Sequence, residues 1–277
     1  MIKQVLVGLD GCKDTETVVR YGSSLAKKHG ARLLGLAVVD VADIEDRYHT
    51  PRPLGAGSAD SQWYDDSIKE ARELAESAIK TFEKVCSDEG IDHKSIIAEG
   101  KPSVEILAKG ALSDVIILRD VTKFTCGLSE DEFCDATAEV LDHSTRPLIL
   151  LPEEYREIKN VMIALDFQRL ADKLLFNYVH LNPYPDAKVH IVHASNKSDV
   201  EVPQELVDFF ELHKIDVTTS ILAGDHTGQA LVNYAKTEKV DMAVMGIHTM
   251  SKVWKVLLGS TGRYVIDKLD IPVFTMT

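Results

Sequence analysis

The chain has no excess of positive charge. Its 277 residues include 31 basic and 44 acidic side chains, which give a formal net charge of −13 at pH 7. The overall field of so acidic a protein repels nucleic acid and anionic membrane surfaces. The charge therefore disfavours a protein that binds nucleic acid or a membrane surface, but it leaves room for a local pocket that holds a nucleotide.

The chain also lacks long apolar runs, a secretion signal and paired cysteines. No apolar run approaches the roughly 20 residues of a membrane span. Residues 1–5 enter a strand pattern directly, without the basic segment, apolar stretch and cleavage site of a signal peptide. The four cysteines form no CxxC pair and have no metal-ligand spacing. These absences predict a reduced, cytoplasmic protein with no membrane span and no metal site.

The ten histidines likewise show no ligand spacing such as HxxxH. His190 and His193 fall in one predicted strand, and we expect them to share one face of it. Packing within a sheet explains such a pair better than a metal ion does.

What the sequence does contain is one order of elements, present twice. The letters IKQV near the start and IKNV in the second half each open an apolar strand pattern. These patterns end at Asp10 and Asp166, which are 156 positions apart (166 − 10). Both copies close on a proline followed by apolar residues, at Pro147 and Pro272. Matches at both ends indicate an internal repeat.

Each copy alternates apolar strand patterns with amphipathic helix patterns. Continuous apolar strands joined by helices are typical of a parallel sheet covered on both faces. We therefore predict an α/β protein with two tandem doubly wound parallel sheets of five strands each, a Rossmann-like nucleotide-binding fold. The predicted domains are residues 1–151 and 158–277, with a polar linker at 152–157. Residues 40–64 contain prolines and glycines without periodicity, and we expect a surface loop there, either an insertion or a lid.

One stretch of the second copy carries the strongest binding signal. An apolar run ends at Gly246, and after a loop the letters GSTG at 259–262 lead into a helix pattern. Small residues let an anion approach the unpaired N–H groups and the positive dipole end of a helix start. Ser260 and Thr261 add hydroxyl donors, although the same letters also suit an ordinary helix start.

The position of this turn predicts a ligand site in the second copy. Ligands of doubly wound sheets bind outside the carboxyl ends of the strands, where the strand order reverses. Asp166 and Gly246 end the first and fourth predicted strands of this copy, so we expect them to converge. In the first copy Asp131 and Glu132 stand where small residues should open a helix, and carboxylates there would repel a phosphate.

These features resemble the universal stress protein family in its tandem form, with two such domains in one chain, and the resemblance covers essentially the whole sequence. ATP-binding members carry the motif G-x-x-G-x9-G-[S/T] after the fourth strand. Gly246, Thr249, Gly259 and Ser260 stand at its four defined positions, and Thr249 departs from the usual glycine. The resemblance implies that Gly259, Ser260 and Thr261 bind the phosphates of ATP or AMP, with or without Mg²⁺.

The resemblance also assigns residues around the adenosine. It implies that Asp166 contacts the adenosine and that backbone groups of His193 and Ala194 meet the adenine. The alternative for Asp166 is a capping residue after a strand. By the same resemblance the first domain is a degenerate copy that does not bind ATP, and its crevice near Asp10 and Cys12 holds another ligand or none. The two domains are expected to pack as the family's homodimers do, and two chains to associate further.

Three functions remain open. The leading hypothesis is a nucleotide-binding stress or signalling protein that acts through partners and is at most a slow ATPase, with no catalytic residue assigned. The second is an adenylating ligase or pyrophosphatase, but the chain has no spare length for the additional catalytic domain that such enzymes need. The third is a scaffold or a binder of small ligands other than nucleotides, which Thr249 and the degenerate first copy favour.

Overall fold

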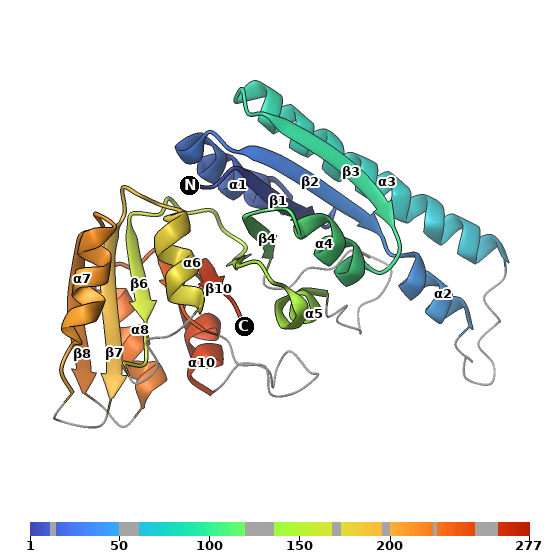
Figure 1. The fold of residues 1–277 in the computed structure, drawn as a ribbon. Coiled ribbons are helices and arrows are strands. Elements are labelled where there is room, and N and C mark those ends of the chain that lie inside the picture. Colours follow the sequence, from blue (N-terminus) through green and yellow to red (C-terminus); the bar gives the residue numbers. More distant parts are fainter. Residues whose placement is uncertain are drawn as a thin grey trace.

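The computed structural model describes residues 1–11, 15–49, 61–119, 136–167, 173–195, 200–223, 226–246 and 260–277 (Figure 1). The elements of the first half are β1 (Gln4–Leu9), α1 (Thr15–His29), β2 (Arg32–Val39), α2 (Val41–His49), α3 (Ser61–Asp88), β3 (His93–Glu99), α4 (Pro102–Gly110), β4 (Val115–Arg119), α5 (Ala136–His143) and β5 (Leu148–Leu151). The elements of the second half are β6 (Asn160–Ala164), α6 (Lys173–Leu181), β7 (Lys188–Ser195), α7 (Gln204–Leu212), β8 (Val217–Ala223), α8 (Thr227–Thr237), β9 (Met242–Val244), α10 (Ser260–Leu269) and β10 (Val273–Thr275). Within these described ranges, no helix is both long and apolar enough to cross a membrane.

The strands form a single ten-stranded sheet in the order β3-β2-β1-β4-β5-β10-β9-β6-β7-β8. Neighbours within each half are parallel, and the halves meet at the antiparallel pair of β5 and β10, where Ile149 lies opposite Phe274. The order is the same from either outer edge, so the predicted duplication of a parallel five-stranded unit is confirmed. The two five-stranded units do not stand apart but join edge to edge at this pair. The last strand of each copy would otherwise expose unpaired backbone groups, and pairing these two edges satisfies both.

The duplication extends to polar contacts between the first and fourth strands of each copy. In the first half, Asp114 accepts hydrogen bonds from the backbone N–H groups of Lys3 and Gln4, at 2.6 and 3.0 Å. In the second half, Asp241 accepts hydrogen bonds from the two backbone N–H groups at the start of β6, at 3.0 and 2.9 Å. The first residues of a strand have N–H groups that need partners, and in both copies the equivalent carboxylate satisfies them.

Alternation along the strands divides the core into two apolar layers, one on each face of the sheet. Val7 and Ile163 belong to one layer, while their chain neighbours Leu6 and Met162 belong to the other. All four side chains are fully buried. Both layers continue across the β5–β10 seam, so the two halves share one core on each face.

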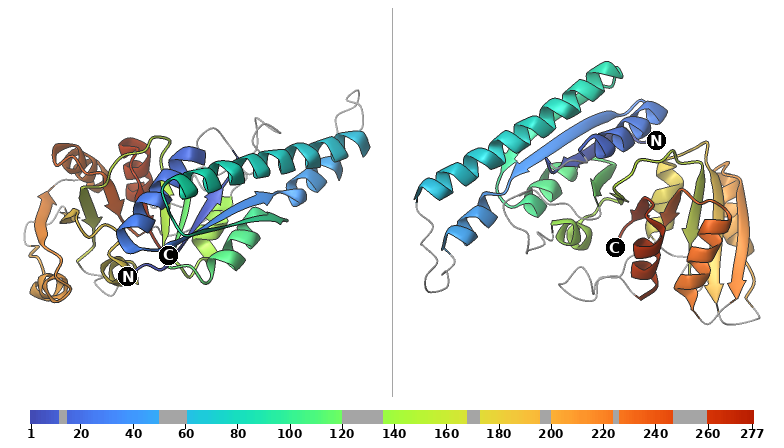
Figure 2. Two further views of the ribbon diagram at one scale, coloured as in Figure 1. Left: turned by 90° about the horizontal axis from the view of Figure 1, so that it is seen from above. Right: turned by 180° about the vertical axis from the view of Figure 1, so that it is seen from behind.

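The predicted loop over residues 40–64 is wrong at both of its ends. Helix α2 begins directly after Asp40, which accepts a hydrogen bond from the N–H of Asp43 at 3.0 Å and so caps the helix. Helix α3 begins already at Ser61 and runs for 28 residues. Figure 2 shows α3 lying along β2 and β3 and extending past the sheet beside α2. The prolines and glycines that suggested a loop fall in residues 50–60, outside the described residues.

Contacts from α1 hold the segment between the two copies. The Tyr21 hydroxyl donates to the Glu154 carbonyl at 3.3 Å and accepts from the Arg156 N–H at 2.9 Å. Burial raises the pKa of Tyr21 to about 12, so this hydroxyl keeps its proton and can donate. Near the end of the same helix, Lys28 pairs with Asp186 at 2.8 Å. Helix α1 thus contacts both the connecting segment and the second half.

Candidate functional site

The strand ends of the second half meet at one edge of the sheet. Ile163 of β6 pairs with Val244 of β9 in parallel register, so the residues that follow these two strands leave the sheet side by side. Asp166 follows β6, Gly246 follows β9, and both are exposed. This register therefore places the two predicted residues at the same edge.

Asp166 is exposed because both of its neighbours are anchored. Leu165 donates its N–H to the Val192 carbonyl at 3.0 Å, and its own carbonyl accepts from His193 Nδ1 at 2.8 Å. On the other side, the buried Phe167 ring stacks on the His193 imidazole, with ring centroids 4.5 Å apart and 17° between the planes. The Asp166 side chain is thereby directed away from the core, at the carboxyl edge.

The supporting roles of Phe167 and of the His193 side chain were missed from the sequence. We assigned His193 through its backbone, beside Ala194, which lies half-buried near the end of β7. The order Leu-Asp-Phe, an exposed carboxylate between two large apolar residues, was the available signal. It indicates a charged residue held in place by buried neighbours.

His190 and His193 do not share a face, so that expectation is wrong. They are three positions apart, and side chains of a strand return to the same face only every second residue. His190 Nδ1 lies 3.1 Å from the Tyr234 hydroxyl of α8, whereas His193 contacts the loop after β6 on the other face. His190 therefore takes no part in the edge that carries Asp166.

The predicted helix after the GSTG letters is confirmed, and it begins at Ser260. The first turn of α10 contains no acidic residue. Since β9 and β10 are parallel neighbours, α10 must return from the carboxyl edge of the sheet to the opposite edge, so its N-terminus lies at the carboxyl edge. Thr261 is the second residue of this helix, while Thr249 and Gly259 lie outside the described residues.

A close contact with α8 sets the position of α10. A Cβ built on Gly228 would lie only 3.1 Å from the Tyr264 ring, so the two helices approach through the space that a glycine leaves. The Tyr264 hydroxyl also donates to the Gln229 side chain. The unpaired N–H groups of a helix start attract anions, and the first turn of α10 contains no acidic residue that would oppose one.

The corresponding edge of the first half is covered. Asp10 follows β1 as Asp166 follows β6, but its exposed fraction is only 5%. Gly11 has a left-handed backbone, with φ +74°, and a Cβ there would lie 3.2 Å from the Leu74 carbonyl oxygen of α3. Helix α3 therefore packs directly over the end of β1. Cys12, the other residue predicted for this crevice, lies outside the described residues.

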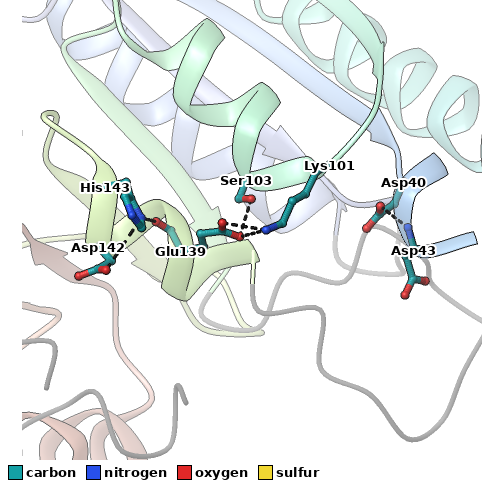
Figure 3. Close-up of polar contacts among 7 residues, drawn as sticks. All are labelled: Asp40, Asp43, Lys101, Ser103, Glu139, Asp142 and His143. Atoms are coloured by element: carbon teal, nitrogen blue, oxygen red, sulfur yellow. Dashed lines mark hydrogen bonds and ion pairs between the residues drawn. The ribbon is translucent and has the colours of Figure 1, made fainter. Parts of the chain in front are cut away.

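The helix start of the first half also differs in charge. Helix α5 has Glu139 in its first turn, and this carboxylate accepts from Lys101 Nζ at 2.8 Å and from Ser103 Oγ at 2.7 Å (Figure 3). Burial disfavours the charged form, but the bonds from Lys101 and Ser103 outweigh it and lower the pKa of Glu139. At neutral pH a carboxylate, paired with Lys101, thus lies at this helix start. Asp131 and Glu132, which we expected to play that part, lie outside the described residues.

Comparison with known proteins agrees with this architecture. The model of the universal stress protein family matches residues 1–109 and 207–276, more than half of the chain. A universal stress protein from Synechocystis sp. is 24% identical over 294 aligned positions, which cover 99% of each chain.

Solved structures show the same fold. A universal stress protein from Archaeoglobus fulgidus superposes with a TM-score of 0.69 at 21% identity, covering 99% of this chain and 96% of that one. A protein from Pseudomonas aeruginosa described as functionally unknown gives 0.61 at 13% identity, covering 99% and 92%. The chain belongs to the universal stress protein family, with two such domains in tandem.

Proposed function

We propose that the second domain binds an adenine nucleotide, ATP or AMP, at the carboxyl ends of β6, β7 and β9. The observation that carries this proposal is the start of α10. It opens with Ser260 at the edge where Asp166 is exposed, and its first turn contains no carboxylate. A positively polarised helix start with no acidic residue in its first turn, at the same edge as an exposed carboxylate, suits a ligand with phosphates at one end and sugar hydroxyls at the other.

The proposed roles follow from this arrangement. Gly259, Ser260 and Thr261 bind the phosphates through N–H groups and hydroxyls, and Gly246 leaves room beneath them. Asp166 accepts a hydrogen bond from the adenosine. Backbone groups at His193 and Ala194 face the adenine, and Thr249 offers a hydroxyl where a glycine is usual. Mg²⁺ would arrive with the nucleotide, and no side chain is assigned to it.

Signalling in a stress response, through partners, is the function that this site supports best. We assign no catalytic residue, so turnover of ATP would be slow. The pairing of β5 with β10 and the contacts of Tyr21 support two further proposals. The domains are residues 1–151 and 158–277, and they pack as a dimer does, within one chain. We also propose that the protein is cytoplasmic and that two chains can associate.

A thermal-shift experiment tests the nucleotide site. ATP or AMP should raise the melting temperature of the wild type. At a ligand concentration of 100 Kd, binding should stabilise the folded protein by about 2.7 kcal/mol. Gly259→Asp should abolish that shift, because it places a carboxylate where the phosphates lie. Ser87→Asp adds the same charge at an exposed position of α3 and should leave the shift intact. A full shift in Gly259→Asp would refute the site.

The alternative is a binder of small ligands other than nucleotides, which the departure at Thr249 favours. Protein purified without added nucleotide separates the two functions. Adenine nucleotide in the supernatant of the denatured protein supports the first. A different compound there, together with no thermal shift from ATP or AMP, supports the second.

A further inference from the structure

A cluster of four rings lies on the outer surface of the second domain, away from the candidate nucleotide site. Helices α6 and α7 pack side by side against the same face of the sheet (Figure 1). Phe176 and His180 of α6 stack with ring centroids 3.8 Å apart. His180 contacts His213, just after α7, at 4.7 Å, and His213 contacts Phe209 at 4.9 Å. Both histidines are exposed.

The first domain has an ion pair between its corresponding helices. Glu89 and His213 each precede the left-handed residue that follows the helix, Gly90 with φ +68° and Lys214 with φ +58°. Glu89 pairs across to Lys27 of α1 at 3.3 Å. The second domain has a neutral imidazole where the first has the Glu89 carboxylate, and this imidazole contacts the ring of His180 instead of a lysine. The contact between α6 and α7 is therefore made by rings rather than by opposite charges.

The nitrogen atoms of this pair are available for a ligand. His180 Nδ1 lies 2.9 Å from the Phe176 carbonyl oxygen, which can only accept, so Nδ1 carries the proton. The lone pair is then on Nε2, the arrangement by which proteins orient a metal-binding histidine. Among the described residues, Nε2 of His180 and both ring nitrogens of His213 make no hydrogen bond.

The two rings lie close enough together to share a metal ion. Two imidazoles can bind one ion through metal–nitrogen bonds of about 2.1 Å, with an N–metal–N angle between those of square-planar and tetrahedral coordination. Their ring centroids are then about 4.5–5.2 Å apart. The observed separation of His180 and His213 is 4.7 Å. Stacking on Phe176 holds the first ring in place, so little ordering is needed when an ion binds.

We propose that His180 and His213 bind one divalent transition-metal ion such as Zn²⁺, Ni²⁺ or Cu²⁺, with water completing its coordination. Imidazole nitrogen prefers these ions over Mg²⁺ and Ca²⁺, which take oxygen ligands. The described residues contain no group of three or more candidate ligands, so this is an open site with two protein nitrogens. The net charge of −13 also raises the local concentration of cations around the protein.

Calorimetric titration of the untagged protein with Zn²⁺ or Cu²⁺ tests this site. Wild type should bind one ion per chain at these residues and should not bind Mg²⁺ there. His180→Ala and His213→Ala each leave a single imidazole, and each should weaken binding about a hundredfold, because the second contact is then no longer intramolecular. Both side chains are exposed, so the variants should fold, which melting temperature verifies.

His143→Ala is the matched control. His143 is also at the end of a helix, and its Nδ1 lies 2.9 Å from the carbonyl oxygen four residues earlier, but no second imidazole contacts it within the part of the chain that the structure describes. Its removal should not change the affinity. Electron paramagnetic resonance of the Cu²⁺ complex should show coupling to two imidazole nitrogens in wild type and to one in either variant of the pair. Wild-type affinity in His180→Ala or His213→Ala would overturn the proposal.

Discussion

Asp10 and Asp166 occupy the same position in the two copies, yet one is buried and the other exposed. The difference comes from the helix beside each of these two strand ends. Helix α3 has 28 residues and packs over the end of β1, whereas its counterpart α7 has nine, and among the described residues no such helix covers Asp166 after β6. A residue retained in both copies of a repeat therefore need not keep its function in both, because the length of a neighbouring helix decides whether a ligand can reach it.

The helix starts after the fourth strands differ in the same sense. Glu139 places a carboxylate in the first turn of α5, while α10 opens without an acidic residue. The exposure of the aspartate and the charge at the helix start both favour an anionic ligand in the second copy over the first. Four predictions test this difference between the copies, from the largest expected effect to the smallest.

Gly35→Ile gives the first domain the residue that the second domain carries at this register position, since Gly35 pairs with Val7 as Ile191 pairs with Ile163. A Cβ at Gly35 would lie 2.7 Å from the buried Phe82 ring of α3. We expect the free energy of unfolding to fall by about 3 kcal/mol in urea, because α3 can no longer lie close to β2.

Lys94→Ile is the control for this prediction, because it adds the same side chain at an exposed position of the neighbouring strand β3. It should change stability by about 0.5 kcal/mol or less. A Gly35→Ile variant as stable as the control would show that the close approach of α3 does not depend on the glycine.

Phe167→Ala removes the support of Asp166, a feature that the first domain lacks. The loss of a buried ring stacked on His193 at the sheet edge should cost about 2 kcal/mol of unfolding free energy. The exposed Phe176→Ala serves as the control and should cost about 0.5 kcal/mol. Equal costs for the two substitutions would mean that the stacked ring does not anchor this edge.

Asp166→Asn and Asp10→Asn compare the two equivalent carboxylates directly. If the second domain binds adenine nucleotide as proposed, Asp166→Asn should weaken binding about tenfold, since it replaces a charged hydrogen-bond acceptor by a weaker neutral one. Asp10→Asn should leave the affinity unchanged, because Asp10 is buried in the other domain. Equilibrium binding of a fluorescent ATP analogue measures both, and similar losses in the two variants would contradict the assignment.

Glu139→Gln should have the smallest effect, and the effect should depend on pH. The pKa of Glu139 is lower in the folded protein than its usual value, so the charged form favours folding above the usual carboxyl range. This contribution disappears as the pH falls through the lowered pKa. The side chain is 37% exposed, which limits the effect to about 0.5–1 kcal/mol. Urea unfolding at neutral and acid pH should show a difference from wild type only at neutral pH, and Lys101→Met should remove most of it.

The parts of the fold that could be predicted from the sequence are local or repeated. Apolar runs ending at Asp10, Asp166 and Gly246 identify buried strands. Agreement between the copies gives the order of strands and helices along each half of the chain. The start of α10 was predicted because small residues before an amphipathic pattern have a direct physical meaning. The paired edges of β5 and β10 were not, because strand pairing between distant segments leaves no mark in either segment alone.

The candidate site shows the same division. Asp166 and Gly246 are found from strand ends, whereas Phe167 acts through a contact with a strand 26 residues later (193 − 167). The Glu139 carboxylate is held by Lys101 and Ser103, which lie at the start of α4, far from Glu139 in the sequence. The histidine pair of α6 and α7 is separated by 33 positions (213 − 180), so no spacing rule could reveal it.

The antiparallel seam has a consequence for synthesis of the chain. The residues of β5 leave the ribosome more than a hundred positions before those of β10 that must cover them (273 − 151 = 122). Through that interval the nascent first domain presents a completely apolar strand, LILL, with an open edge. Such an edge invites the β10 segment of another nascent chain, so molecules that exchange this strand are the misassembled product to look for when the protein is made rapidly.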